Sequence, residues 1–460
     1  MSASISRREF LRLGVAIGGA AALAACGAPA TEAPVVEEGP TAAPEGGEKV
    51  TLTHWQSDWG KEWNDPMIKL SDTWIEDTGA NAEMEWTFLT DLTEKLPSAI
   101  AAGDPPDIAT IDEGYGIPKM AKAGGLMNLK SYYEADGIKG EDFIRFTWET
   151  CLYHNEPYGI PGGAGALVLW YRKDLFEKAG IDPESVPDTP SWAQFMDWNQ
   201  KLIQRDSAGK ITNYGLIWPW WDQWHGVLGA GPYYNEDLTK LLINAPETVE
   251  AVQKVRSTLP EGMTVDELNT LNSGIPTTWF GGLGSGIQAI VADGYWSFYA
   301  LDNYWKDLDY GCVKLPTPNG TKEEWYLYTG WVWDPSIPKG AKHPDMAWQF
   351  LKYGYWEHGE KLAYTLNWTS SLKCFEEFIK ITEEIAGADN RIIPYLHHFS
   401  EAQYAAKTFY PWTPIFQKLN DTMGQAIDQV MRDLKTAQEA LDEVVATMQP
   451  ELDAAVAEGF

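Results

Sequence analysis

The spacing of apolar and polar positions predicts alternating strands and helices near the start of the folded part of the chain. Residues 50–55 form a short apolar stretch typical of a buried strand, and residues 83–88 form another. Residues 65–78 have helical periodicity and end at Gly79, which favours a helix terminus. A second helical stretch at 91–102 is also followed by glycine.

A third strand is predicted in the stretch 105–113, which gives the order strand, helix, strand, helix, strand. This order indicates an α/β fold with a mostly parallel sheet and helices on both faces. In open sheets of this kind, ligands bind beyond the carboxyl ends of the strands. The polar loop after the first strand, with Gln56, Ser57 and Asp58, is therefore a candidate binding loop.

The first 26 residues have the pattern of a signal peptide. Arg7 and Arg8 precede an apolar stretch at 13–23, which is shorter than the about 20 residues that a membrane span needs. The paired arginines resemble the twin-arginine export signal, and Leu-Ala-Ala-Cys ending at Cys26 resembles the lipobox of bacterial lipoproteins. These resemblances imply export and a mature chain that begins at Cys26 with a lipid on its thiol.

Residues 27–49 are predicted to form a disordered tether. They contain four Pro, five Glu and five Ala and no aromatic residue, so they bury too little apolar surface to offset the loss of chain entropy. The part of the 460-residue chain that follows this tether is too long for a single hydrophobic core, so two domains are expected.

Charge and cysteine content exclude some classes of protein. The formal net charge of −31 disfavours binding to nucleic acid or to an anionic surface. Beyond Cys26, the cysteines are Cys151, Cys312 and Cys374, an odd number with long separations, which argues against a disulfide framework. A single bridge among them remains an open alternative.

Tryptophan is abundant, with 23 residues, all between Trp55 and Trp412. An indole has a flat apolar face and one N–H donor, which suits the C–H faces and hydroxyls of sugars. The stretch 218–224 holds four tryptophans, which cannot all point into one core. Some of them are expected to face a cleft or solvent.

Several stretches resemble motifs of the extracellular solute-binding proteins that deliver sugars to ATP-driven importers. One is Ala-Gly-Asp-Pro-Pro-Asp-Ile at 102–108, and another is the strand and helix that end in Asp-Leu-Phe-Glu-Lys-Ala-Gly-Ile at 174–181. The remaining stretches follow in the same order as in that family: 158–161, 190–195, with Ser191 as a helix cap, 289–296, 310–316 and 337–351.

The resemblance implies a periplasmic-binding-protein-like α/β fold, with two lobes, a hinge and a ligand cleft between the lobes. Lobe 1 is expected at 50–160 and 316–362, and lobe 2 at 161–315 and 363–460. The chain would cross between the lobes near 158–163, 313–317 and 362–365, where glycines at 162, 163 and 165 would supply backbone freedom.

The resemblance also implies a set of ligand contacts. Asp112 and Glu113 end the third strand, Trp296 falls on the stacking tryptophan of the family, and Trp331 and Trp333 stand where relatives have smaller residues. The full expected ligand-binding set is Gln56, Ser57, Asp58, Asp112, Glu113, Trp218, Trp221, Trp224, Trp296 and Trp331.

These observations predict a monomeric, lipid-anchored extracytoplasmic receptor that captures a carbohydrate and passes it to the membrane subunits of an ABC transporter. No catalytic residue and no cofactor are expected. No metal is expected either, since His397 and His398 lack a third ligand at metal spacing in the sequence. The glycine-rich run 281–286 is interpreted as a flexible turn and 423–456 as a packed helix. An extracellular glycoside-active enzyme and a receptor for peptides or organic cations remain alternatives.

Overall fold

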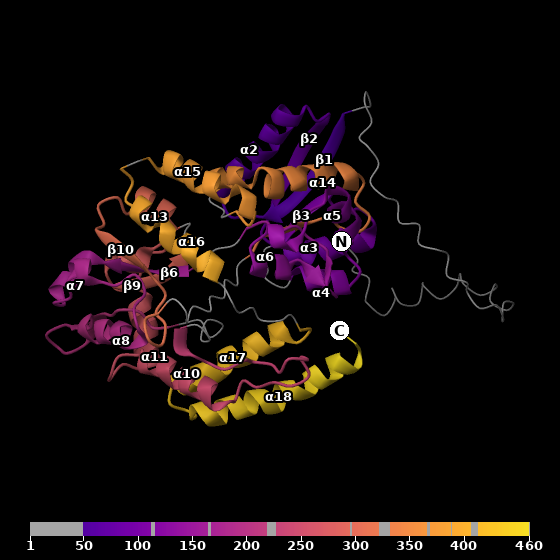
Figure 1. The fold of residues 1–460 in the computed structure, drawn as a ribbon. Helices are drawn as coiled ribbons and strands as arrows, with labels where there is room; N and C mark the ends of the chain where they lie inside the picture. Colours follow the sequence, from indigo (N-terminus) through magenta and orange to yellow (C-terminus); the bar gives the residue numbers. More distant parts are fainter. Residues whose placement is uncertain are drawn as a thin grey trace, which may run out of the picture. The chain divides into compact units, whose positions relative to one another are not determined.

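The computed structural model describes residues 49–111, 116–163, 167–218, 227–294, 297–321, 332–365, 369–387, 389–405 and 413–459. Figure 1 shows their fold. Within these ranges, no helix is both long and apolar enough to cross a membrane. The signal peptide and almost all of the tether predicted at 1–49 lie outside the described residues.

A four-stranded sheet has the order β11-β3-β1-β2. β1 runs parallel to β2 and to β3, whereas β11 pairs with β3 in the antiparallel direction, so the prediction of a mostly parallel sheet is confirmed. The elements of this region are β1 (Val50–Ser57), α2 (Lys61–Thr78), β2 (Ala82–Leu89), α3 (Leu92–Ala102), β3 (Ile108–Ile111), α4 (Gly116–Lys122), α5 (Lys130–Asp136), α6 (Arg145–Thr150), β4 (Leu152–Tyr153), β5 (Glu156–Pro157), β11 (Asp334–Ser336) and α14 (Pro344–Lys352).

Both faces of the parallel sheet are covered, as predicted. Neighbouring residues of a strand point to opposite faces, and in β3 Ile108 packs with Leu52 while Ala109 packs with Leu96 of α3. α2 ends at Gly79, whose φ of 68° is left-handed and favours glycine. Its start at Lys61 lies earlier than the predicted residue 65.

A second sheet has the order β10-β6-β9, and both of its strand pairs are antiparallel. In β6, Leu169 packs in a core with the C-terminal helices, while Trp170 on the other face packs in the core that also contains Leu52 of β1. The elements of this region are β6 (Leu167–Arg172), α7 (Lys173–Lys178), α8 (Trp192–Lys201), β7 (Gln204–Arg205), β8 (Ile211–Asn213), α10 (Pro246–Ser257), α11 (Val265–Asn272), α12 (Gly281–Ser285), β9 (Ile290–Gly294), α13 (Ser297–Tyr304), β10 (Tyr310–Lys314), α15 (Phe375–Ala386), α16 (Leu396–Ala405), α17 (Phe416–Met431) and α18 (Ala437–Ala457).

Short helical turns complete the chain: η1 (Gly140–Asp142), η2 (Pro183–Ser185), η5 (Tyr353–Glu357), η6 (Gly359–Thr365), η7 (Leu372–Cys374) and η8 (Ile393–Tyr395). The predicted cap at Ser191 is confirmed. Its hydroxyl accepts from the backbone N–H of Gln194 at 3.2 Å, and the Gln194 side chain accepts from the N–H of Ser191 at 2.8 Å.

Two expectations about helices need correction. The stretch 423–456 is not one helix, because the chain turns at Asp433, with a φ of 55°, between α17 and α18. The two helices pack in one core, and their pairing is visible in Figure 1. The glycine-rich run is not a flexible turn, because it forms α12, where a Cβ atom on Gly284 would overlap the indole of Trp305.

The three described cysteines are buried and free. Cys151, Cys312 and Cys374 therefore do not form the single disulfide left open by the sequence. Their burial makes them part of the apolar interior.

Candidate functional site

The candidate binding loop begins at a buried amide. Gln56 lies near the carboxyl end of β1 with 0% of its surface exposed. Neither Oε1 nor Nε2 of its side chain has a hydrogen-bond partner among the residues that the structure describes. An unsatisfied buried amide is costly, so a group that accepts and donates hydrogen bonds here would bind favourably. Ser57 follows it and is partly buried.

Asp58 has a structural role in the same loop. Its Oδ1 accepts hydrogen bonds from the Asn64 side chain at 2.8 Å and from the backbone N–H of Gly60 at 3.0 Å. These two hydrogen bonds, with that from Asn64 the larger influence, lower the pKa of Asp58. Asp58 therefore fixes the entry into α2, and its predicted ligand contact stays a prediction.

Partly buried aromatic rings surround the start of α2. The Trp63 ring lies 5.2 Å from that of Trp279 and 5.5 Å from that of Tyr299, while Trp59 meets Trp333 edge to face at 5.5 Å. We call these five residues, which form one trio and one pair, the aromatic cluster. It joins α2 beside the parallel sheet to α13, which follows β9 of the antiparallel sheet.

The aromatic cluster also holds polar groups. Nε1 of Trp279 donates a hydrogen bond to Oδ2 of Asp293 at 3.3 Å, and Asp293 ends β9 together with Gly294. Sequence reasoning singled out Trp333 but missed Trp63, Trp279 and Tyr299. Their only signal in the sequence is the general excess of aromatic residues, because they come from three separate segments.

Trp218 lies in a core. It is 1% exposed, and its ring packs edge to face against Trp192 at 6.2 Å and Phe195 at 5.8 Å. Its backbone N–H donates to the Thr258 hydroxyl at 3.2 Å. This burial argues against the predicted contact of Trp218 with ligand, because the indole presents no open face.

Most of the other expected contacts cannot be placed. Asp112, Glu113, Trp221, Trp224, Trp296 and Trp331, together with the lipidation residue Cys26, lie outside the described residues. β3 ends at Ile111, and Asp112 and Glu113 are the next two residues in the sequence.

The first predicted crossing runs along β11. Ile160 donates its backbone N–H to the carbonyl of Pro335 at 2.9 Å, and Trp333 donates to the carbonyl of Gly163 at 3.1 Å. A Cβ atom on Gly162 would overlap the carbonyl oxygen of Trp333. Glycine is required at 162 for this close approach, whereas the sequence reasoning attributed it to backbone freedom.

A buried carboxyl stands at the same place. Asp334 is 1% exposed, and burial raises its pKa to about 7. Its Oδ2 lies 2.7 Å from the Thr150 hydroxyl, which is also 2.8 Å from the carbonyl oxygen of Thr147. The hydroxyl has one hydrogen and can donate to only one of these oxygens, so a protonated Asp334 can supply the other hydrogen.

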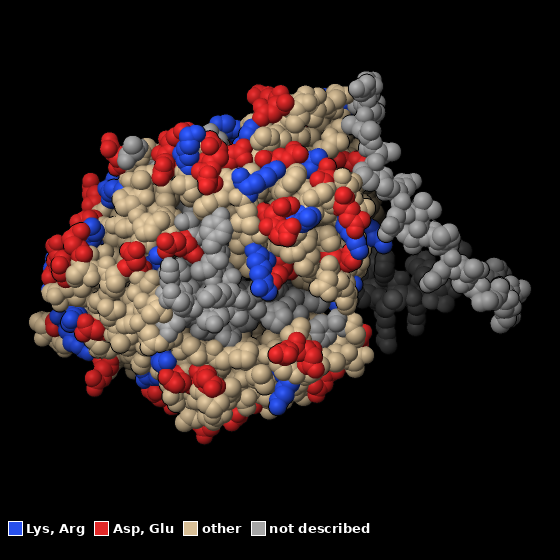
Figure 2. All heavy atoms as spheres, viewed as in Figure 1, with Lys and Arg blue, Asp and Glu red and all other residues tan. Residues whose placement is uncertain are grey.

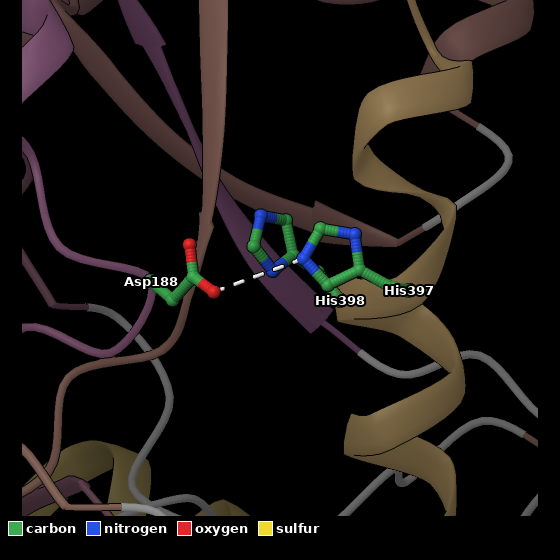
Figure 3. Close-up of side chains that lie close together, drawn as sticks. All are labelled: Asp188, His397 and His398. Carbon is green, nitrogen blue, oxygen red and sulfur yellow. Dashed lines mark ion pairs between the residues drawn. The ribbon is translucent and has the colours of Figure 1, made fainter.

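One polar cluster contradicts the sequence reasoning. His397 and His398 do have a third side chain beside them, namely Asp188 from a distant part of the chain. Figure 3 shows the two imidazoles on α16 and the carboxylate on the facing loop. Sequence spacing missed this arrangement because the fold, and not the local sequence, brings Asp188 to the helix.

Acidic side chains are spread over the visible surface. In Figure 2 they lie singly or in small groups and alternate with lysines and arginines. Many are paired, as in the bridge between Arg256 and Asp433 at 2.7 Å. The surplus of acids in a chain of net charge −31 is therefore distributed over this face.

Comparison with known proteins decides the family. Residues 53–355 match the model of the family described as bacterial extracellular solute-binding protein. The chain belongs to this family. Members of the family are binding proteins and not enzymes, which confirms the prediction of a non-enzymatic protein. The family description also agrees with the predicted location outside the cytoplasm.

Solved structures show that this solute-binding protein has the periplasmic-binding-protein fold, as predicted. It is similar to CpMnBP1 with mannotriose bound, with a TM-score of 0.65, 21% identity, and coverage of 86% of this chain and 99% of that one. The sugar-binding protein MalE of Xanthomonas citri gives a TM-score of 0.67 at 16% identity, covering 89% of this chain and 100% of MalE.

Sequence relatives match over shorter stretches. The sn-glycerol-3-phosphate-binding periplasmic protein UgpB of Pectobacterium atrosepticum is 28% identical over 177 residues, which are 36% of this solute-binding protein and 38% of UgpB. The match thus spans less than half the length of that relative.

Proposed function

We propose that this protein is a membrane-anchored extracytoplasmic receptor that captures a carbohydrate and delivers it to the membrane subunits of an ABC importer. The observation that carries the proposal is the combination of the aromatic cluster with the buried, unpartnered amide of Gln56. Both belong to the region around the carboxyl end of β1, where open α/β sheets bind ligands.

The chemistry of this region suits a neutral polyhydroxylated ligand. Indole faces pack against the C–H faces of a sugar ring, and a buried primary amide both donates to and accepts from hydroxyl groups. Similar solved proteins are described as bound to mannotriose and, for a cyclo/maltodextrin-binding protein, to maltotetraose. These descriptions support a mono- or oligosaccharide as the ligand here.

The lobes are proposed at the boundaries expected from the sequence. The strands of the parallel sheet fall within 50–160 and 316–362, and those of the antiparallel sheet fall within 161–315, in agreement with this division. A sugar that contacts both lobes would stabilise the closed arrangement by its higher affinity for that state. Trp221, Trp224, Trp296 and Trp331 are proposed as further stacking residues, with Asp112 and Glu113 as polar contacts.

Attachment to the membrane is proposed through a lipid on Cys26 after export by the twin-arginine route. The residues around Arg7, Arg8 and Cys26 support this step. Replacing Cys26 with Ser is expected to release the protein from the membrane fraction, which immunoblotting of separated fractions would detect. Continued retention in the membrane would refute the lipid anchor and would not affect the proposal of a carbohydrate ligand.

The ligand class can be tested by thermal unfolding of the purified protein with a panel of compounds. The panel contains mono-, di- and oligosaccharides, glycerol phosphate, peptides and cationic osmolytes, and each compound is analysed after incubation. A midpoint shift with one sugar class, recovered intact, supports the proposal. A shift with glycerol phosphate alone would assign the ligand named for UgpB, a shift with peptides or cations alone would assign that class, and cleavage of a glycoside would identify an enzyme.

A further inference from the structure

Two histidines and an aspartate converge on the antiparallel-sheet side of the molecule. His397 and His398 lie in the first turn of α16, and Asp188 lies in the loop between η2 and α8. One ligand atom from each residue lies within 4.8 Å of the others, and Oδ2 of Asp188 is 3.8 Å from Nε2 of His397. In Figure 3 the His398 ring has a nitrogen turned toward the line that joins those two atoms.

His398 adds an independent observation. Its side chain is 2% exposed, and its Nδ1 has no hydrogen-bond partner among the described residues. An imidazole nitrogen without a hydrogen-bond partner is available as a ligand for a metal ion.

We propose that Asp188, His397 and His398 form a binding site for a divalent transition metal ion of the Zn²⁺ type. Imidazole nitrogens and a carboxylate oxygen are ligands that Zn²⁺ uses in proteins, and water can complete the tetrahedron. With bonds of about 2.0 to 2.2 Å, tetrahedral ligand atoms lie roughly 3.3 to 3.6 Å apart. The Asp188 Oδ2 to His397 Nε2 distance of 3.8 Å would therefore shorten by about 0.2 to 0.5 Å, and the other two distances, each within 4.8 Å, by at most about 1.5 Å.

The side chains are built to make this adjustment. Asp188 is 68% exposed and can change its rotamer, whereas the His397 ring packs 4.1 Å from the ring of His398, which is held in the interior. The His398 ring stacks on Tyr395 with centroids 5.9 Å apart. Rotation of the exposed Asp188 side chain can bring its carboxylate closer to the two imidazoles.

The surrounding charges favour a cation. Lys314 of β10 faces the histidines, but it pairs with Glu401 on α16 and is thereby compensated. Asp188 then supplies a net negative charge among the charged groups that act on His398, namely Asp188, Lys314 and Glu401. A bound dication would be attracted by this charge instead of repelled by Lys314.

The ion would tie a loop to a helix. The loop is already held to the end of β10 and to the residues after it, because Lys314 donates its backbone N–H to the carbonyl of Asp188 at 3.0 Å and Thr317 donates to that of Pro190 at 3.0 Å. Coordination by α16 would add a third attachment at this point. Metal binding should therefore raise the thermal stability of the protein.

The test is a Zn²⁺ titration of the full chain, carrying no histidine tag, against a chromophoric chelator. The variants are Asp188→Asn and His397→Ala, both at exposed positions that leave the core intact. The matched control is His358→Ala, because His358 lies 3.1 Å from Glu360 but belongs to no three-residue cluster in the described part of the chain.

We expect one tightly bound Zn²⁺ per chain and a rise in the unfolding midpoint with Zn²⁺. Each variant should weaken binding at least as much as the about 10- to 100-fold seen when second-shell partners of metal sites are lost, and should abolish the rise in midpoint. The control should behave like the unmodified protein. Equal Zn²⁺ affinity in all four proteins, binding only at millimolar Zn²⁺, or an equal loss in the control would overturn the proposal.

Discussion

The two sheets hold buried polar groups in different ways. In the parallel sheet, His54 of β1 and Asp334 of β11 are at most 1% exposed and form no ion pair with any described residue. In the antiparallel sheet, Lys314 pairs with Glu401, and Arg172 donates to both carboxylate oxygens of Asp174 at 2.7 and 2.8 Å. The parallel sheet therefore buries these two groups without a described counter-ion, whereas the buried Lys314 and the partly buried Arg172 of the antiparallel sheet pair with more exposed carboxylates.

This difference separates the kinds of ligand that each region suits. Burial lowers the pKa of His54 to about 3 and raises that of Asp334 to about 7, so both side chains are neutral over much of the acidic range. Gln56, two residues after His54 in β1, is neutral and has no partner among the described residues. In the parallel sheet, the Gln56 amide can thus offer hydrogen bonds to a neutral ligand, whereas Lys314 and Arg172 of the antiparallel sheet are held by carboxylates.

The largest expected effect concerns pH. Between pH 3.8 and 7 the folded protein keeps the Asp334 proton that the unfolded chain loses, so Asp334 makes stability fall as pH rises. Between pH 3 and 6.5 the unfolded chain protonates His54 and the folded protein does not, so His54 makes stability rise with pH. Each slope is at most about 1.4 kcal/mol per pH unit, and in the unmodified protein the two oppose each other.

Asp334→Asn should therefore expose the contribution of His54. Its free energy of unfolding, measured with urea at a series of pH values, should rise more steeply with pH between 4 and 6.5 than that of the unmodified protein. Asp421→Asn on the exposed side of α17 serves as the control and should keep the original slope. Equal slopes in all three proteins would show that Asp334 is not a buried neutral acid.

The next largest effect is expected for the ion pair between Lys314 of the antiparallel sheet and Glu401. Glu401→Gln should destabilise the protein by about 2 to 3 kcal/mol, because it leaves the Lys314 ammonium, 5% exposed, without its carboxylate. Asp266→Asn, which removes an 81% exposed partner of Arg432, should cost less than about 1 kcal/mol. Similar losses in the two variants would remove the contrast between buried and surface pairs.

The aromatic cluster should affect ligand binding more than stability. Trp63→Ala is expected to weaken binding of the sugar identified in the panel by about 10- to 100-fold, because a stacking face is lost. Trp356→Ala is the matched control, since this indole instead lies under the Lys373 ammonium at 3.5 Å. Calorimetric titration of both variants tests the assignment, which fails when their affinities are equal.

The smallest expected effect is a substitution that stabilises the free protein but weakens its binding of sugar. Gln56→Leu should stabilise the free protein by about 1 kcal/mol, since it removes a buried amide without partners, and should weaken sugar binding. Asn199→Leu is the control, because this buried amide donates to the carbonyl of Leu216 at 2.7 Å and accepts from its N–H at 2.8 Å. Asn199→Leu should destabilise the protein. Destabilisation by Gln56→Leu as well would mean that the Gln56 amide has hydrogen-bond partners.

Local sequence predicted the parallel sheet well because its signals are local. The strand that contains Gln56 and the helix that ends at Gly79 are specified by neighbouring residues. The antiparallel pairing of β6 with β9 was not predicted, since strand direction depends on a segment far along the chain. The contacts of Trp63 with Trp279 and of His397 with Asp188 also join segments far apart in the chain. The spacing of residues in the sequence therefore could not predict either pair.

The buried cysteines have a practical consequence for measuring the proposed movement of the two lobes. Burial raises the pKa of the thiols of Cys151, Cys312 and Cys374, so they are poor nucleophiles at neutral pH. Within the described part of the chain, no native thiol then competes with a cysteine introduced on the surface. Fluorescent or spin labels can be attached to one exposed helix on each sheet, and their separation followed during ligand binding, without first replacing these three residues.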